Sequence, residues 1–457
     1  MKNTIKKISA LVLSLCMILS LFTICTFADE REEVEFKAYI WSDELLSTIM
    51  SEQYYFEVSP ETTTFESNEV YVVKGTVTVD NRIECGQNVK LVLTDGSVLN
   101  VDKGIHVTGS LDIYAEKDGN GTINSTLARE NNNFSNIGIN TGEGGCDIAV
   151  HGGDINLIHN GDESCINAGT GSFTQYAGDI SSIANWGNGI KAGTINICSG
   201  KLTTFSNGGA GITATTVNIY DGELDCTGSS GAAVEGKDIT INGGEVMAKS
   251  SSGAAIGGGD AKSSMVNISS CNSITINNGF VQASSYTGAV IGSGFAGSCN
   301  TITINNGKVS LANTYGGALG SAVGGTCKTV CINGGMILSI GAYAHDPQGF
   351  AFRGTDGFGC KAGTMPEIKL GKDIKLHYRA SLEEPQKDTD YVTSTSKNIK
   401  TTLQDKKSLS VIPSDVYGYT GAILSGGSTT IIIACVALLI GAAAGLLIGK
   451  KLFGKKA

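Results

Sequence analysis

A turn glycine followed by a short alternating strand recurs through the middle of this chain, and this repeat restricts the fold more than any other feature. The intervals between successive turn glycines are 25, 22, 22, 22, 35, 28 and 28 residues. The turn glycines are Gly153, Gly178, Gly200, Gly222, Gly244, Gly279, Gly307 and Gly335. A unit this short cannot bury an apolar face by itself, so successive units must stack on one another.

Each unit contains three short strands separated by turns. Pairs such as Ile274 and Ile276 are spaced by two residues and therefore point to one side of a strand. A second alternating strand follows the turn glycine, and a third apolar stretch follows a glycine-rich corner. Periods near 40 residues, typical of propellers, and the leucine-rich repeat pattern are both missing. The repeat predicts an all-β fold, a right-handed single-stranded parallel β-helix (a solenoid) over residues 70–379.

The two ends of the chain carry targeting signals. Basic residues and an apolar run ending at Thr26-Phe27-Ala28 predict a signal peptide over 1–28, with an uncleaved anchor as the alternative. Residues 429–449 begin with 20 uncharged positions, long enough for a transmembrane helix, and lysines follow over 450–457. The positive-inside rule then predicts a cell-membrane protein with one span, an extracellular N-terminal ectodomain and a cytoplasmic basic tail.

Three further segments follow from this division. Residues 29–69 are acidic and lack glycine, and we expect them to form an N-terminal cap for the open end of the solenoid. Residues 380–428 are polar and form a stalk or linker to the membrane. Small residues at Gly441, Gly445 and Gly449 form a stripe along the span that could pair two helices in a homodimer.

Charge and cysteine content exclude some classes of function. The net charge of −10 argues against a nucleic-acid partner, since few cations are available to neutralise phosphates. The absence of any Cys-x-x-Cys pair argues against a zinc site. Cys271, Cys299 and Cys327 are 28 residues apart, so they should stack; parallel Cβ vectors suit a disulfide poorly, which favours buried, reduced thiols.

Stacked in register, the position after the turn glycine forms a column of charged and apolar residues. It comprises Asp154, Asp179, Lys201, Glu223, Glu245, Phe280, Lys308 and Met336. Asp154 and Asp179 would lie one rung apart and could share a cation, with Asp162 and Glu163 as further weak metal candidates. The alternative is a solvated column of alternating charge. No catalytic constellation of carboxylates with Arg or His is found.

Aromatic residues near one corner are the candidate ligand site. Tyr286, Tyr315, Tyr343 and Trp186 hold similar offsets within their coils, so they could form an outward ladder on which sugar rings stack. A purely structural tyrosine stack is the alternative.

Two stretches resemble known families. EVYVVKGTVTVDNRIECGQNVKLVLTDGSVLNVDKGIHVTGSLDIYAEKDGNGTI (69–123) and ITINGGEVMAKSSSGAAIGGG (239–259) resemble β-helical surface proteins of Gram-positive gut anaerobes. GKLTTFSNGGAGITATTVNI (200–219) resembles a bacterial β-helix family described as carbohydrate-binding. That family often carries Asp before the corner glycine, where it contributes to calcium binding; here the corner reads Asn188-Gly189 and Ala210-Gly211. No cofactor is therefore expected, with calcium as the alternative.

Three functions from different classes remain open. The leading hypothesis is a non-enzymatic surface protein that binds an extracellular glycan or another surface ligand in adhesion. The second is a polysaccharide lyase or hydrolase with an unrecognised site. The third is a structural spacer of the cell envelope.

Overall fold

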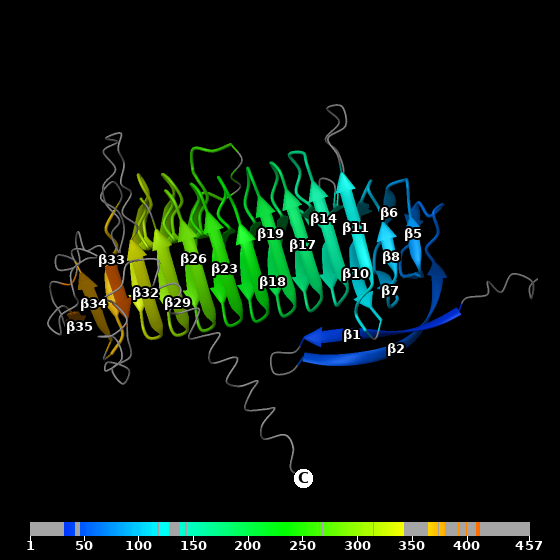
Figure 1. Ribbon diagram of the computed structural model, residues 1–457, viewed down its shortest axis with the longest axis horizontal. Coiled ribbons are helices and arrows are strands. Elements are labelled where there is room, and N and C mark those ends of the chain that lie inside the picture. The colour runs from blue at the N-terminus through cyan, green and yellow to red at the C-terminus, as the bar shows by residue number, and fades with distance from the viewer. Residues whose placement is uncertain are drawn as a thin grey trace, which may run out of the picture.

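The computed structural model of this chain contains a long parallel β-solenoid of about 10 turns (Figure 1). The structure describes residues 32–41, 46–116, 118–127, 138–141, 144–264, 266, 268–313, 315–341, 364–372, 374–379, 391–393, 399 and 408–411. The predicted signal peptide, membrane span, basic tail and most of the stalk lie outside these residues, as do Tyr343 and the Gly441–Gly449 stripe. Within the described ranges, no helix is long and apolar enough to cross a membrane.

Three columns of parallel strands form the faces of the solenoid, which confirms the prediction of stacked three-stranded coils. The first face contains β3 (Thr64–Phe65), β6 (Ile83–Cys85), β9 (Ile105–Val107), β12 (Ile139–Asn140), β15 (Ile166–Asn167), the first halves of β18 (Ile190–Ile197), β20 (Ile212–Ile219) and β22 (Val234–Ile241), then β24 (Ile256–Gly257), β27 (Ile291–Gly292) and β30 (Leu319–Gly320).

The second face contains β4 (Val70–Val73), β7 (Val89–Leu93), β10 (Ser110–Ala115), β13 (Asp147–Val150), β16 (Ser172–Gln175), the second halves of β18, β20 and β22, and then β25 (Ser270–Ile276), β28 (Ser298–Ile304), β31 (Thr326–Ile332) and β33 (Glu367–Leu370). The third face contains β5 (Thr76–Thr78), β8 (Val98–Asn100), β11 (Thr122–Leu127), β14 (Asp154–His159), β17 (Asp179–Ala184), β19 (Lys201–Ser206), β21 (Glu223–Thr227), β23 (Glu245–Ser250), β26 (Phe280–Ser285), β29 (Lys308–Asn313) and β32 (Met336–Gly341). The right-handed sense of the winding stays a prediction.

The register of these strands stacks identical side chains inside the solenoid. Ile274 pairs with Ile302, and Ile276 with Ile304, and all four side chains are fully buried. Burying one such side chain stabilises the fold by roughly 1.5–3 kcal/mol. One interior therefore runs from Phe65 in the first coil to Ile337 in the last, built from pairs that no single coil could bury.

Glycine is required at the end of the first-face strands. Gly257, Gly292 and Gly320 have φ of +140°, +140° and +120°, which L-residues rarely adopt. A Cβ at Gly292 would overlap the carbonyl oxygen of Gly320 in the next coil. The repeated Ile-Gly and Leu-Gly pairs in the sequence therefore let the backbones of neighbouring coils meet without side chains between them.

Outside the solenoid, a ladder of asparagines follows the second-face strands. Asn277, Asn305 and Asn333 each donate a side-chain N–H to the amide oxygen of the preceding asparagine, at 2.8 Å in every case, beginning at Asn242. Towards the N-terminus the equivalent positions carry rings. His151 stacks between Tyr114 and Tyr176, with centroid distances of 4.3 and 4.7 Å. These hydrogen-bonded and stacked columns join adjacent coils at the bend that follows the second face.

Antiparallel strands occupy both ends of the described chain. β1 (Glu32–Trp41) and β2 (Leu46–Glu57) form a hairpin that lies along one long side of the solenoid (Figure 1), and the end of β2 pairs with β4 in the first coil. Tyr55 of this hairpin belongs to a small outer cluster with Val72, Val92 and Tyr114. At the far end, β34 (Lys375–Arg379) and β36 (Ser408–Val411) pair antiparallel with each other. β36 also pairs with β32, and β35 (Tyr391–Thr393) with β34.

The stacked cysteines have the predicted register. Cys271 pairs with Cys299, and Cys299 with Cys327, and all three thiols are buried and unbridged. The neighbouring thiol and burial raise the pKa of Cys327 far above its ordinary value. Protonated thiols therefore fit this interior as small apolar side chains.

Candidate functional site

The charged column predicted from the turn glycines is confirmed on the third face. The observed partners run Asp154, Asp179, Lys201, Glu223, Glu245, Phe280, Lys308 and Met336. The Lys201 ammonium lies 2.7 Å from a Glu223 carboxylate oxygen. Burial raises the pKa of Asp154, and the charge of Asp179 raises it further.

The four weak metal candidates do not form one cluster. Asp154 and Asp179 are neighbours in register, whereas Asp162 and Glu163 lie in the loop after β14. The backbone carbonyl of Glu163 accepts a hydrogen bond from His159 Nδ1 at 2.6 Å, and burial lowers the pKa of that histidine. Within the residues that the structure describes, no group of three or more His, Cys, Asp or Glu could hold a metal ion. The expectation of no cofactor, with calcium as the alternative, stays a prediction.

Three exposed apolar side chains lie on the third face or just after one of its strands, one predicted from the sequence and two that sequence reasoning missed. Trp186 is 44% exposed, Ile183 41% and Phe205 39%. Ile183 and Phe205 are register partners on β17 and β19, so they lie about 4.8 Å apart along the stack. We call Ile183, Trp186 and Phe205 the aromatic patch. The alternation of side chains along a strand could have predicted the exposure of Ile183 and Phe205. Ile180 and Leu202 point inward, so the residue three positions after each of them points outward.

The neighbouring coil makes room for the Trp186 ring. Gly208 lies beside it, and a Cβ at Gly208 would be 3.1 Å from Trp186 Cε3. The indole therefore lies against bare backbone of the next coil. Along the same two strands, Ser181, Thr203 and Asp179 also point outward. Hydroxyl groups and a carboxylate thus lie roughly 7 to 14 Å from the patch, at the two-residue spacing of a strand.

The predicted tyrosine ladder exists only as a pair within the described part of the chain. Tyr286, 52% exposed, meets Tyr315 edge to face, with ring centroids 4.9 Å apart and an interplanar angle of 85°. Phe280 and Lys308 are register partners. Tyr286 lies six positions after Phe280, whereas Tyr315 lies seven positions after Lys308. The one-residue offset explains why the rings do not stack in parallel. Trp186 lies several coils away, so it does not join this pair.

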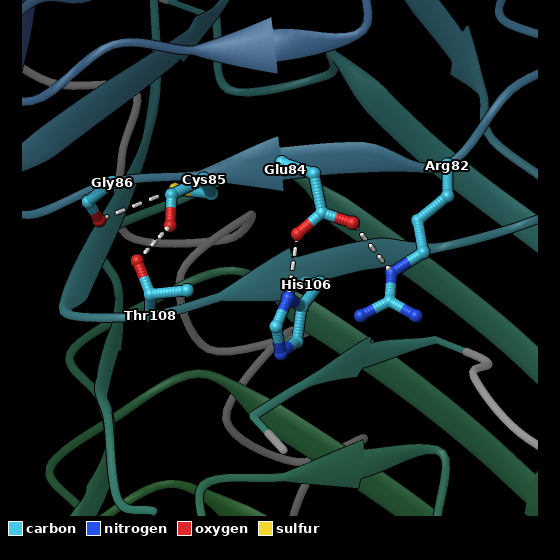
Figure 2. A network of polar contacts seen from close by, with 6 residues as sticks. All are labelled: Arg82, Glu84, Cys85, Gly86, His106 and Thr108. Atoms are coloured by element: carbon cyan, nitrogen blue, oxygen red, sulfur yellow. Dashed lines mark hydrogen bonds and ion pairs between the residues drawn. The ribbon is translucent and has the colours of Figure 1, made fainter.

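A second group missed from the sequence combines an arginine, a carboxylate and a histidine on the first face (Figure 2). Glu84 Oε2 lies 2.6 Å from His106 Nδ1, and Glu84 Oε1 lies 3.2 Å from Arg82 Nε. In a neutral imidazole, donation of the Nδ1 proton to Glu84 leaves a lone pair on Nε2 that can accept a proton. In Figure 2 this Nε2 and the terminal nitrogens of Arg82 point to the same side of Glu84. Arg82 and Glu84 lie two residues apart in the chain, and His106 joins them because β6 and β9 are stacked.

A polar groove of about 400 Å³ lies on the outside of the solenoid where the first and second faces meet. Its lining includes Lys191, Thr194, Thr213, Thr215 and Thr216 from β18 and β20, and Ile268 from the insertion before β25. No residue of this groove was singled out from the sequence. The insertion itself was visible as a longer repeat interval, but the recess beside it depends on how the coils stack.

The fold and its outward columns define the class of this molecule: a parallel β-solenoid protein with an aromatic patch, a Glu–His–Arg group and a polar groove on its outer surface. Comparison of the chain with protein-family models, with curated proteins and with solved structures finds no match.

Proposed function

We propose that this chain is an exported, membrane-anchored surface protein whose solenoid binds glycan through the aromatic patch. The observation that carries the proposal is the exposure of Ile183 and Phe205 on adjacent strands, with Trp186 just after β17, while the other outward positions of these two strands are polar. Exposed apolar clusters with a polar rim are typical of binding sites. A sugar ring presents C–H groups on its flat side and hydroxyl groups at its rim, which matches rings flanked by Ser181 and Thr203.

The direction of stacking favours a chain-like ligand. Each rung advances about 4.8 Å, so the patch covers two rungs and polar columns continue on both sides. A polysaccharide lying along the stack would meet Ile183 and Phe205 and then Thr227 and Lys249, the next register partners in the same column. Tyr286 and Tyr315 offer a second, smaller aromatic surface farther along the rod.

The cellular setting rests on the sequence. The signal peptide over 1–28 and the span over 429–449 support export and anchoring, with the solenoid outside the cell. Dimerisation through Gly441, Gly445 and Gly449 is part of this proposal, and crosslinking of the full-length chain in membranes before and after Gly445→Leu tests it.

A glycan array followed by fluorescence titration tests the binding proposal. The chain has two tryptophans, so in a Trp41→Phe background Trp186 reports the patch alone. We expect a ligand-dependent change in Trp186 emission and at least a 10-fold loss of affinity in Phe205→Ala. Met336→Ala, which removes an exposed apolar side chain elsewhere on the same face, is the matched control and should bind normally. Absence of binding to every glycan would refute the proposal and favour a structural spacer.

The Glu–His–Arg group favours a second candidate function, an enzyme acting on polysaccharide. His106 Nε2 would take the proton from the carbon next to a sugar carboxylate, and the C–O bond to the departing sugar would break as a ring C=C bond forms. The imidazolium, held by Glu84, would then give the proton to the departing oxygen, while Arg82 would neutralise the carboxylate. The release of unsaturated or reducing ends from glycans that bind tests this function. His106→Gln should abolish such activity and leave glycan binding at the aromatic patch unchanged, so that chemistry and binding are separated.

A further inference from the structure

The polar groove exists because one coil before β18 and another after β22 are longer than the coils between them. Ile166 pairs with Ile190 and Ser172 pairs with Thr194, so residues 167–171 face the shorter segment 191–193. The two extra residues form a projecting bend that contains Thr170. On the other side, the insertion between β24 and β25 provides Ile268. β18 and β20 therefore form a floor between two walls.

Gly193 keeps the floor low where it lines the groove. Ala192 and Ala214 also border the groove, but their side chains are buried in the core. A Cβ at Gly193 would overlap the carbonyl oxygen of Thr170, so glycine is required for the longer coil to pass over it. The volume of about 400 Å³ is within the range of small-molecule sites, roughly 300–1,000 Å³.

A buried carboxylate fixes the wall made by the insertion. Glu235 is fully buried and accepts hydrogen bonds from Thr213 Oγ1 at 2.8 Å, from the backbone N–H of Ile268 at 2.9 Å and from that of Ala232 at 3.3 Å. Its lone pairs are used by these donors. Glu235 therefore positions Ile268 and occupies the Thr213 hydroxyl, and it is not itself part of the exposed lining.

The polar groups that remain are one ammonium and several hydroxyls. Lys191 is the cationic residue of the lining, and no carboxylate lines the groove with it. In the described residues Lys191 forms no ion pair, although the whole chain carries a net charge of −10. The hydroxyls of Thr194, Thr215 and Thr216 belong to the same lining.

We propose that this groove binds a tetrahedral oxyanion, the phosphate or sulfate monoester group of a small molecule. A lysine ammonium acts as a compact point charge, and hydroxyls on neighbouring strands can donate to oxygens pointing in several directions. A planar carboxylate is bound more strongly by two parallel N–H donors of an arginine guanidinium, and the lining contains no arginine. The groove and the aromatic patch use different faces, so this inference does not depend on glycan binding at Trp186.

Isothermal titration calorimetry of the full-length chain tests the proposal with defined probes. These are inorganic phosphate, inorganic sulfate, glucose 6-phosphate, N-acetylglucosamine 6-sulfate, glucuronate and glucose. We expect at least one ester to bind, with glucuronate and glucose at least 10-fold weaker. The two esters distinguish a phosphate source from a sulfate source. Binding of the inorganic ions without either ester, or equal binding of glucuronate or glucose, overturns the assignment.

Matched variants locate the site. Lys191→Met keeps the apolar stem and should weaken ester binding at least 10-fold, while Lys191→Arg should retain most of it. Thr215→Val, at an exposed position, should weaken binding several-fold. Lys249→Met removes the same charge from the third face and should bind as the wild type does. Equal affinity of Lys191→Met and Lys249→Met overturns the proposal, and Trp186→Ala should leave ester binding unchanged.

Discussion

Replacing Gly292 by alanine tests whether backbone contact between coils requires glycine. At φ of +140° the residue lies in a region that costs an L-amino acid about 2 kcal/mol. The new Cβ would overlap the Gly320 carbonyl oxygen and lie 2.9 Å from its carbonyl carbon, so only movement of the next coil relieves it. Such movement breaks the bonds from Ile291 N to Ala318 O and from Ser293 N to Gly320 O, both 3.0 Å. At about 1 kcal/mol for each bond, the total is about 4 kcal/mol.

Gly96→Ala is the matched control. Gly96 also has a positive φ, +73°, but nothing lies within 4 Å of a Cβ placed there. Only conformational strain remains, about 1 kcal/mol. Since solenoids can unfold in parts, the readout is amide hydrogen exchange, and about 4 kcal/mol corresponds to roughly 10³-fold faster exchange around Ile291. Equal effects of the two substitutions would show that contact between coils is not the reason why glycine is required at position 292, and the reasoning would be wrong.

Three other predictions address charge, thiols and the core. Burial raises the pKa of Cys226 to about 12, so iodoacetamide at about pH 8 should label half-buried Cys331 and spare Cys226 until the chain is unfolded, as read by mass spectrometry. Because the folded-state pKa of Asp154 is raised, its contribution to stability falls as the pH rises through that range. Asp179→Asn removes one of the two causes of this shift, so it should raise the thermal midpoint more at about pH 7 than at about pH 3; an equal shift at both pH values contradicts this. Ile302→Ala in the fully buried column should cost about 2–5 kcal/mol in urea unfolding, and a cost under about 1 kcal/mol would contradict the assigned register.

The register of the third face could be predicted from the sequence because one turn glycine resets each coil. Each Asp, Lys or Glu after that glycine therefore occupies the same place, whatever the length of the preceding coil. The cysteine column follows for the same reason. Alternation inside each strand then separates core from surface, and Phe205 could have been assigned outward from its odd spacing to Leu202.

The features that escaped prediction depend on lengths between strands. Tyr286 and Tyr315 differ by one position after their strands, and one residue is enough to turn a parallel stack into an edge-to-face pair. Glu84 and His106 are 22 residues apart and show no local pattern until β6 and β9 are stacked. The groove arises from differences in length between coils. The repeat intervals reveal these differences, but they do not show where on the surface the extra residues project.

The resetting turn glycine also has an evolutionary consequence. Since each coil begins again at a glycine and contacts only its neighbours, a whole coil is a unit that recombination can duplicate or delete. Unequal exchange between the nearly identical ITI-containing segments would lengthen the rod by about 4.8 Å for each added unit while keeping the interior continuous. We therefore expect natural variants of this chain to differ by entire coils, so that the length of the rod and the number of rungs in each surface column change together.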